Sequence, residues 1–152
     1  MNGFRLGSKT KVTIEVNDLG ETISLDFGDP TLLEKAQNAM LKINELETKY
    51  QSLNDYLLND IETADILSDE AIYHGKELTN YYLEGRQIMD DFLGQDACYK
   101  VFGNDNYYLM FADLFDELQP YFDEANLKFK NQLKDTRKKY ANRATKATKK
   151  VI

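Results

Sequence analysis

The chain has 152 residues, of which 30% are charged and 12% aromatic, and its formal net charge is −7 at pH 7. This length suits one domain with its own hydrophobic core. The single cysteine excludes an internal disulfide, which is typical of a reducing cytosol. The N-terminus MNGFRLGSKTK lacks the apolar stretch of a signal peptide, and the longest apolar run, 107–112, is too short to cross a membrane. We therefore expect a soluble, cytoplasmic protein.

The charges are divided unequally along the chain. Residues 128–152 hold ten Lys or Arg and one acid, Asp135, a balance of +9, so residues 1–127 carry −16. A basic end on an acidic body suggests nucleic-acid contact, head-to-tail electrostatic association, or folding of the tail onto the body. The alternative is a solvated helix end, where Lys and Arg are favoured.

The first predicted element is a β-hairpin. Val12, Ile14 and Val16 alternate with polar residues, and so do Ile23, Leu25 and Phe27. A period of two places each set on one face of a strand. The residues between them, 17–20, read Asn-Asp-Leu-Gly and are suited to a turn. Residues 1–10 carry no period and are expected to be mobile.

A long helix is predicted over about 31–60. Thr31 and Glu34 match a capping box at its start. Apolar residues then follow at steps of three or four: Ala36, Met40, Ile43, Leu46, Tyr50, Leu53 and Leu57. Such a seam favours packing against a neighbouring helix.

A second helix is predicted from Ser68, a suitable N-cap, to a stop at Gly94. Its stripe contains Gly75 and Gly85 together with Ile72, Leu78, Tyr82, Met89 and Phe92. A glycine costs about 0.5–1 kcal/mol relative to alanine in a helix. The two glycines therefore indicate either a close approach of another backbone or a local kink.

An aromatic helix is predicted from about residue 105 to 140. One stripe holds Tyr108, Phe111, Phe115, Leu118 and Phe122, and Tyr107, Met110 and Leu114 widen it. Pro120 lacks an N–H and predicts a bend or a division into two abutting helices. The basic tail, 141–152, has no apolar stripe and is expected to be disordered.

These elements predict a mainly α protein with a small N-terminal β-hairpin (α+β), built as one domain over 11–140 from antiparallel helices, one of them long. Reactive side chains do not cluster in the sequence. His74 is the only histidine and is expected at the surface or its boundary, and Cys98 is expected to pack as a small apolar residue. Asp113, Asp116 and Glu117 predict a solvated acidic face. We therefore expect no enzymatic activity, no cofactor and no metal.

The segment 96–122 resembles the small tail assembly chaperones of long-tailed bacteriophages and prophages of Gram-positive bacteria. That family often carries a Cys-x-Lys-Val/Ile-Phe-Gly element followed by an aromatic helix. The matching residues here are Cys98, Lys100, Val101, Phe102 and Gly103, then Phe111, Leu114, Phe115, Leu118 and Pro120. The resemblance implies a chaperone in the bacterial host that coats the tape-measure protein before tail-tube subunits polymerise around it.

Two functions are compared on this basis. In the first, a partly uncovered aromatic stripe holds apolar helical segments of a client; the residues expected to bind are Tyr107, Met110, Phe111, Leu114 and Phe115. In the second, a small nucleic-acid-binding or regulatory protein acts through its basic end, with Lys138, Lys139, Arg143, Lys146, Lys149 and Lys150. The first is favoured. Homo-oligomers are expected through the hairpin edge or the helix over 31–60.

Overall fold

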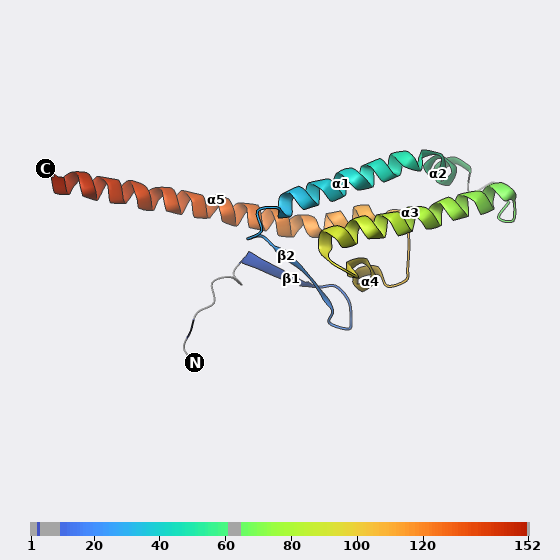
Figure 1. Cartoon of the computed structure of the whole chain (residues 1–152), viewed down its shortest axis with the longest axis horizontal. Helices are drawn as coiled ribbons and strands as arrows, with labels where there is room; N and C mark the ends of the chain where they lie inside the picture. Colours follow the sequence, from blue (N-terminus) through green and yellow to red (C-terminus); the bar gives the residue numbers. More distant parts are fainter. Residues whose placement is uncertain (1–2, 4–9, 61–64, 152) are drawn as a thin grey trace. The chain divides into compact units, whose positions relative to one another are not determined.

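The computed structural model describes residue 3, residues 10–60 and residues 65–151, with side chains up to residue 142. It is mostly helical, with a two-stranded hairpin at its N-terminal end (Figure 1). The predicted fold class is confirmed. The chain divides into two units, Met1–Phe111 and Ala112–Ile152. The predicted mobile segment 1–10 lies, except for Gly3 and Thr10, outside the described residues.

The hairpin consists of β1 (Lys11–Glu15) and β2 (Thr22–Asp26), paired antiparallel with Ile14 opposite Ile23. The Asn17 side chain organises the turn, because its Oδ1 accepts hydrogen bonds from the backbone N–H of Leu19 (2.9 Å) and Glu21 (3.2 Å). Gly20 has φ +76°, a left-handed conformation that glycine adopts without strain. Ile23 and Leu25 are buried, as the alternating pattern predicts.

The long helical segment is interrupted rather than continuous. It comprises α1 (Leu32–Lys49), α2 (Gln51–Asp55) and the π-helical turn η2 (Tyr56–Asp60). The predicted capping box at Thr31 is wrong, because the Thr31 side chain makes no capping hydrogen bond. The Asp29 carboxylate accepts from the Thr31 N–H at 2.9 Å and from the Thr31 hydroxyl at 2.7 Å, so this hydroxyl is occupied outside the helix.

The predicted seam of this segment is only partly correct. Met40 is half exposed, whereas the buried residues are Leu32, Ala39, Ile43, Leu46, Leu53 and Tyr56. Apolar residues on two adjacent faces of this helix each recur at steps of three or four, so the spacing alone does not tell which face is buried. Packing against α3 selects the face that contains Ala39 in place of Met40.

Helix α3 (Asp69–Leu93) begins and ends where the sequence predicts. The Ser68 Oγ accepts from the Ala71 N–H at 3.1 Å, and Gly94 follows the last turn with φ +114°. Lys49 near the end of α1 pairs with Glu84 at 2.6 Å, and Tyr56 further along stacks on His74 near the start of α3. Later residues of the first segment thus meet earlier residues of α3, which makes the two antiparallel, as predicted.

Two further helices follow. The motif segment Cys98–Gly103 lies mostly in a six-residue helix, α4 (Ala97–Phe102). The aromatic helix is α5 (Met110–Val151), with Pro120 inside it, so the division into two helices does not occur. It also extends beyond Tyr140 into the segment predicted to be disordered, where Ala, Lys and Arg have high helix propensity.

Candidate client-binding surface

Helix α4, which carries the first half of the motif, is fixed to α3 through Cys98. The Cys98 N–H donates to the Asp90 carboxylate at 2.9 Å, and its Sγ lies 3.8 Å from the Arg86 carbonyl oxygen. Cys98 is buried. Burial, with a further contribution from the Asp90 charge, raises the pKa of the Cys98 thiol to about 12. This thiol is therefore a packing group and not a nucleophile at neutral pH.

Lys100, the second motif residue, connects α4 to the hairpin. Its Nζ donates to the Thr22 carbonyl at 3.3 Å, and its own carbonyl accepts from the Asn17 side-chain amide at 2.9 Å. The same Asn17 organises the hairpin turn. The motif residues Cys98 and Lys100 thus hold together three elements of the first unit.

Arg86 fixes the connection between α4 and α5. Its Nε donates to Asn106 Oδ1 at 2.8 Å, and its two terminal nitrogens donate to the carbonyls of Gly103 (3.0 Å) and Asp105 (2.7 Å). Gly103 itself ends α4 with φ +62°. One guanidinium group therefore orders residues 103–106, which places the following aromatic residues on a rigid support.

An aromatic cluster fills the core beneath this connection. The Tyr81 ring is stacked on Tyr108 at 5.5 Å between centroids and lies 5.8 Å from Phe111 and 6.0 Å from Tyr50. Tyr108 also donates its hydroxyl to Asn54. Burial raises the pKa of Tyr81 and Tyr108, in keeping with hydroxyl groups inside or beside a packed core.

The structure places most of the predicted client-binding residues in the interior. Met110 is 0% exposed, Phe111 1% and Leu114 4%, so the expectation that they are partly uncovered is wrong. Phe111 can be buried because Gly85 on α3 has no side chain, which leaves room for the Phe111 ring. Phe115 is half-buried, and Tyr107 is the one member of the set that is exposed, at 43%.

Tyr107 belongs to a different group of accessible aromatic side chains. Its ring meets that of Phe102 edge-on at 6.0 Å, and Phe102 is half-buried. Tyr99 precedes Phe102 by three residues on the same helix, which is a neighbouring position, and is 56% exposed. We call Tyr99, Phe102 and Tyr107 the α4 aromatic surface.

The other singled-out side chains are structural or solvated. The expectation that His74 lies at the surface or its boundary is wrong: His74 is buried, its ring stacks on Tyr56 at 4.1 Å, and its Nδ1 lies 2.9 Å from Glu77 Oε1. Asp113, Asp116 and Glu117 are exposed, as predicted. Within the described residues, no group of three or more His, Cys, Asp or Glu side chains could hold a metal ion.

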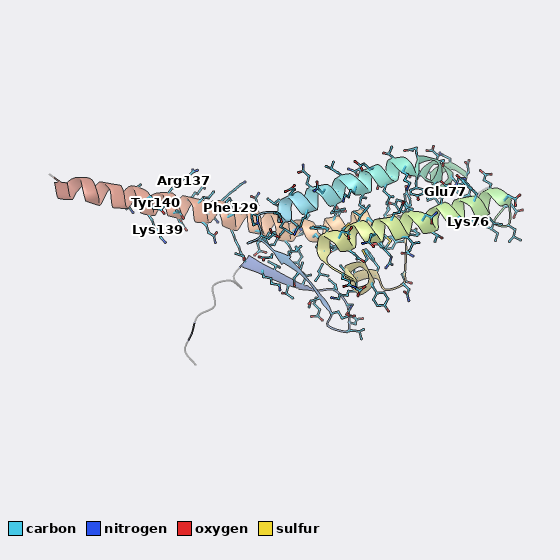
Figure 2. All side chains as sticks on the ribbon, in the orientation of Figure 1. Lys76, Glu77, Phe129, Arg137, Lys139 and Tyr140 are labelled. Atoms are coloured by element: carbon cyan, nitrogen blue, oxygen red, sulfur yellow. The ribbon has the colours of Figure 1, made fainter. Side chains whose placement is uncertain are left out.

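The basic end is described in part. Lys138 and Lys139 are exposed on α5, and Figure 2 shows Lys139 there. The side chains of Arg143, Lys146, Lys149 and Lys150 lie outside the described residues. In the part of the chain that the structure covers, none of the helices has the length and apolarity needed to cross a membrane.

Sequence reasoning missed Arg86 and Asp90, whose contacts to α4 and the following loop position the aromatic surface. A signal was available for Arg86: it lies between Tyr82 and Met89 on α3, next to the predicted buried stripe. An arginine in such a position usually satisfies several acceptors at once. The role of Asp90 could not be predicted from the sequence, because Asp90 accepts a hydrogen bond from Cys98 only when α4 folds back onto α3.

Comparisons with known proteins place the chain in a protein family but find no characterised relative. No curated protein and no solved structure matched the chain. The model of a family of unknown function (DUF6673) matches residues 19–150, which span β2, the helices α1 to α4 and α5 up to its penultimate residue. The chain therefore belongs to this family of unknown function.

Proposed function

We propose that the protein is a tail assembly chaperone of a long-tailed bacteriophage or prophage, acting in the cytoplasm of the bacterial host. It binds apolar helical segments of the tape-measure protein, keeps them soluble and helps to recruit tail-tube subunits. It does so as a binding protein and not as an enzyme. The resemblance of the Cys98–Gly103 motif and the aromatic helix to that family supports this proposal, and the α4 aromatic surface carries it.

The α4 aromatic surface is suited to binding a protein. Tyrosine presents a large apolar ring with a polar end and loses little side-chain entropy on binding, so it is enriched at interfaces. Tyr99 and Tyr107 are both exposed, and Phe102 lies against Tyr107. Arg86 and Lys100 fix the backbone that presents these rings. A preorganised surface loses less conformational entropy when the client docks.

Exposed apolar side chains on other elements are consistent with a binding role. Among the described residues, the large apolar side chains that are exposed are as numerous as the apolar residues in the core. They include Leu33, Met40 and Leu41 on α1 and Leu83 on α3. Residues 1–111 hold nine basic and twenty acidic side chains, a balance of −11. An excess of one charge keeps a complex with an apolar client in solution.

Co-expression with fragments of the cognate tape-measure protein tests this proposal. We expect wild type to keep the fragments in the soluble fraction and Tyr99→Asp and Tyr107→Asp to lose this ability. Tyr73→Asp is the matched control, because Tyr73, at 58%, is about as exposed as Tyr99 but lies near the start of α3. Circular dichroism checks that all three variants fold. Folded Tyr99→Asp and Tyr107→Asp proteins that solubilise the client like the control would contradict the proposal.

A further inference from the structure

The second half of α5 carries an apolar stripe that this chain leaves exposed. Phe129 is 59% exposed, Leu133 41% and Tyr140 64%. Ala125 and Phe122, which lie one and two turns before Phe129, are half-buried. At 100° per residue these five positions project onto one face of the helix, the face that also holds the buried Phe111 and Leu118. Figure 2 shows Phe129 and Tyr140 on this part of α5.

We propose that this stripe pairs with the same stripe of a second copy of the chain, the two helices running antiparallel. Its four large apolar residues lie symmetrically about residue 131: Phe129 and Leu133 are each two residues away, and Phe122 and Tyr140 are each nine residues away. An antiparallel pair centred there places Phe129 opposite Leu133 of the partner subunit and Phe122 opposite Tyr140 of the partner subunit. Both large contacts occur twice, because the pair is symmetric.

Charges beside the stripe favour this direction. In an antiparallel pair, residues on one flank of a helix meet residues on the same flank of the other helix. Asp123 then lies beside Arg137 of the partner subunit. This attractive pair also occurs twice. Lys130 meets its own copy near the two-fold axis, which is a single repulsive pair.

A parallel pair would be electrostatically unfavourable. It brings opposite flanks together at the same level, so Arg137 would lie beside Lys139 of the partner subunit. Like charges in such positions are destabilising. The helix is also acidic over 110–127, with five acids and no base, and basic over 128–151, with ten bases and one acid. Only the antiparallel direction brings these two ends together.

The hydrogen bond that the exposed Asp123 accepts from Gln119, at 2.9 Å, does not oppose the pairing. Exposed pairs one helical turn apart contribute only about 0.2–0.5 kcal/mol. The shared stripe from 122 to 140 is about 27 Å long. This is small for a stable interface, so we expect a dimer with a dissociation constant on the order of micromolar.

This dimer does not depend on the proposed chaperone function and uses a different surface from the hairpin edge and the helix over 31–60. Sedimentation velocity of the full chain over a range of concentrations tests it. We expect Phe129→Glu and Leu133→Glu to weaken dimerisation by about tenfold or more, which corresponds to about 1.4 kcal/mol. Leu127→Glu is the matched control: Leu127 is 60% exposed, but it projects about 140° away from Phe122.

A charge exchange tests the antiparallel direction. Asp123→Arg and Arg137→Asp should each weaken the dimer, and the double variant should restore it, because the exchanged pair is attractive again. A spin label attached to Asn142→Cys in a Cys98→Ala background gives a second reading. The antiparallel pair separates the two labels by about 33 Å along the helix axis, whereas a parallel pair places them at the same level and therefore closer together.

Some results would overturn the dimer itself, and others only its antiparallel direction. A chain that is monomeric at about a hundred micromolar, well above the expected dissociation constant, overturns the proposal. So does a Leu127→Glu variant that dissociates as readily as Leu133→Glu, because the contact then lies on another face. A short label distance, or a double charge variant that stays as weak as the single ones, overturns the antiparallel arrangement. Circular dichroism of each variant confirms that a loss of dimer is not a loss of fold.

Discussion

The aromatic ring of Phe111 lies directly against Gly85. A Cβ placed on Gly85 would be 2.2 Å from Cε2 and 2.3 Å from Cζ of that ring, which is shorter than any real contact. Gly85 lies in the middle of α3, where glycine weakens a helix by about 0.5–1 kcal/mol relative to alanine. The close approach of Phe111 explains why a glycine is present there.

Replacing Gly85 by alanine should therefore destabilise the protein. The added methyl group forces Phe111 out of its position, and overpacking of this kind costs about 1–3 kcal/mol. This exceeds the gain in helix propensity. Urea denaturation followed by circular dichroism measures the difference in free energy of unfolding.

Gly75 provides the control for this substitution. It is a glycine of the same helix, and a Cβ added there would meet nothing within 4 Å outside its own turn of helix. Gly75→Ala should stabilise the protein by about 0.5–1 kcal/mol through helix propensity alone. If the two alanine variants changed stability equally, the contact between Gly85 and Phe111 would not determine the role of Gly85.

Arg86→Lys should loosen the connection between α4 and α5. Lysine keeps the charge but cannot reach Asn106, Gly103 and Asp105 with one planar group. We expect faster hydrogen exchange over 103–109 and a loss of about 1–3 kcal/mol in stability. Lys76→Ala, an exposed position on the same helix, should leave exchange in this segment unchanged. Unaltered exchange in Arg86→Lys would show that the loop is ordered by other contacts.

Stability should fall at alkaline pH. Burial raises the pKa of Cys98 to about 12 from an ordinary value of 9.0, and it also raises the pKa of Tyr81, Tyr82 and Tyr108 above 10.0. The folded state retains these protons. The contribution of Cys98 to the free energy of unfolding is therefore fully present below about pH 9, and it is lost as the pH rises from there to about 12. Urea midpoints measured from pH 7 to pH 11 should decrease above pH 9.

A Cys98→Ala variant separates the thiol from the tyrosines. Its urea midpoint should decrease less steeply between pH 9 and pH 10 than that of wild type, because it lacks the group with the lowest ordinary pKa. A steeper or identical decrease would show that Cys98 is accessible in the folded protein. Reaction with a thiol reagent gives an independent check, since the buried Cys98 should react only after unfolding.

Local signals in the sequence were sufficient for much of the fold. The alternation from Val12 to Phe27 predicted the hairpin, and Ser68 and Gly94 marked the ends of α3. The two glycines of α3 were expected to mark either a close approach of another backbone or a local kink. At Gly85 the side chain of Phe111 approaches instead of a backbone, and at Gly75 nothing lies within 4 Å of an added Cβ.

The candidate site was harder to predict, because periodicity identifies a face of a helix but not what covers it. The aromatic stripe of α5 was expected to be partly open at Met110 and Phe111, and both are core residues. Exposed Tyr99 and Tyr107 lie instead on a support that depends on Arg86 and Lys100. Those contacts join residues that are up to 83 positions apart in the chain, and no local pattern encodes them.

Hydrogen exchange of the complex with a tape-measure fragment tests the central claim, client binding at the α4 aromatic surface, most directly. We predict that the client slows exchange over 97–109, where this surface lies, and leaves exchange near the start of α3, over 69–76, unchanged. The Tyr99→Ala, Tyr107→Ala double variant should lose this protection while its free form exchanges like wild type elsewhere. Protection confined to other segments, or the same protection in the double variant, would contradict the claim.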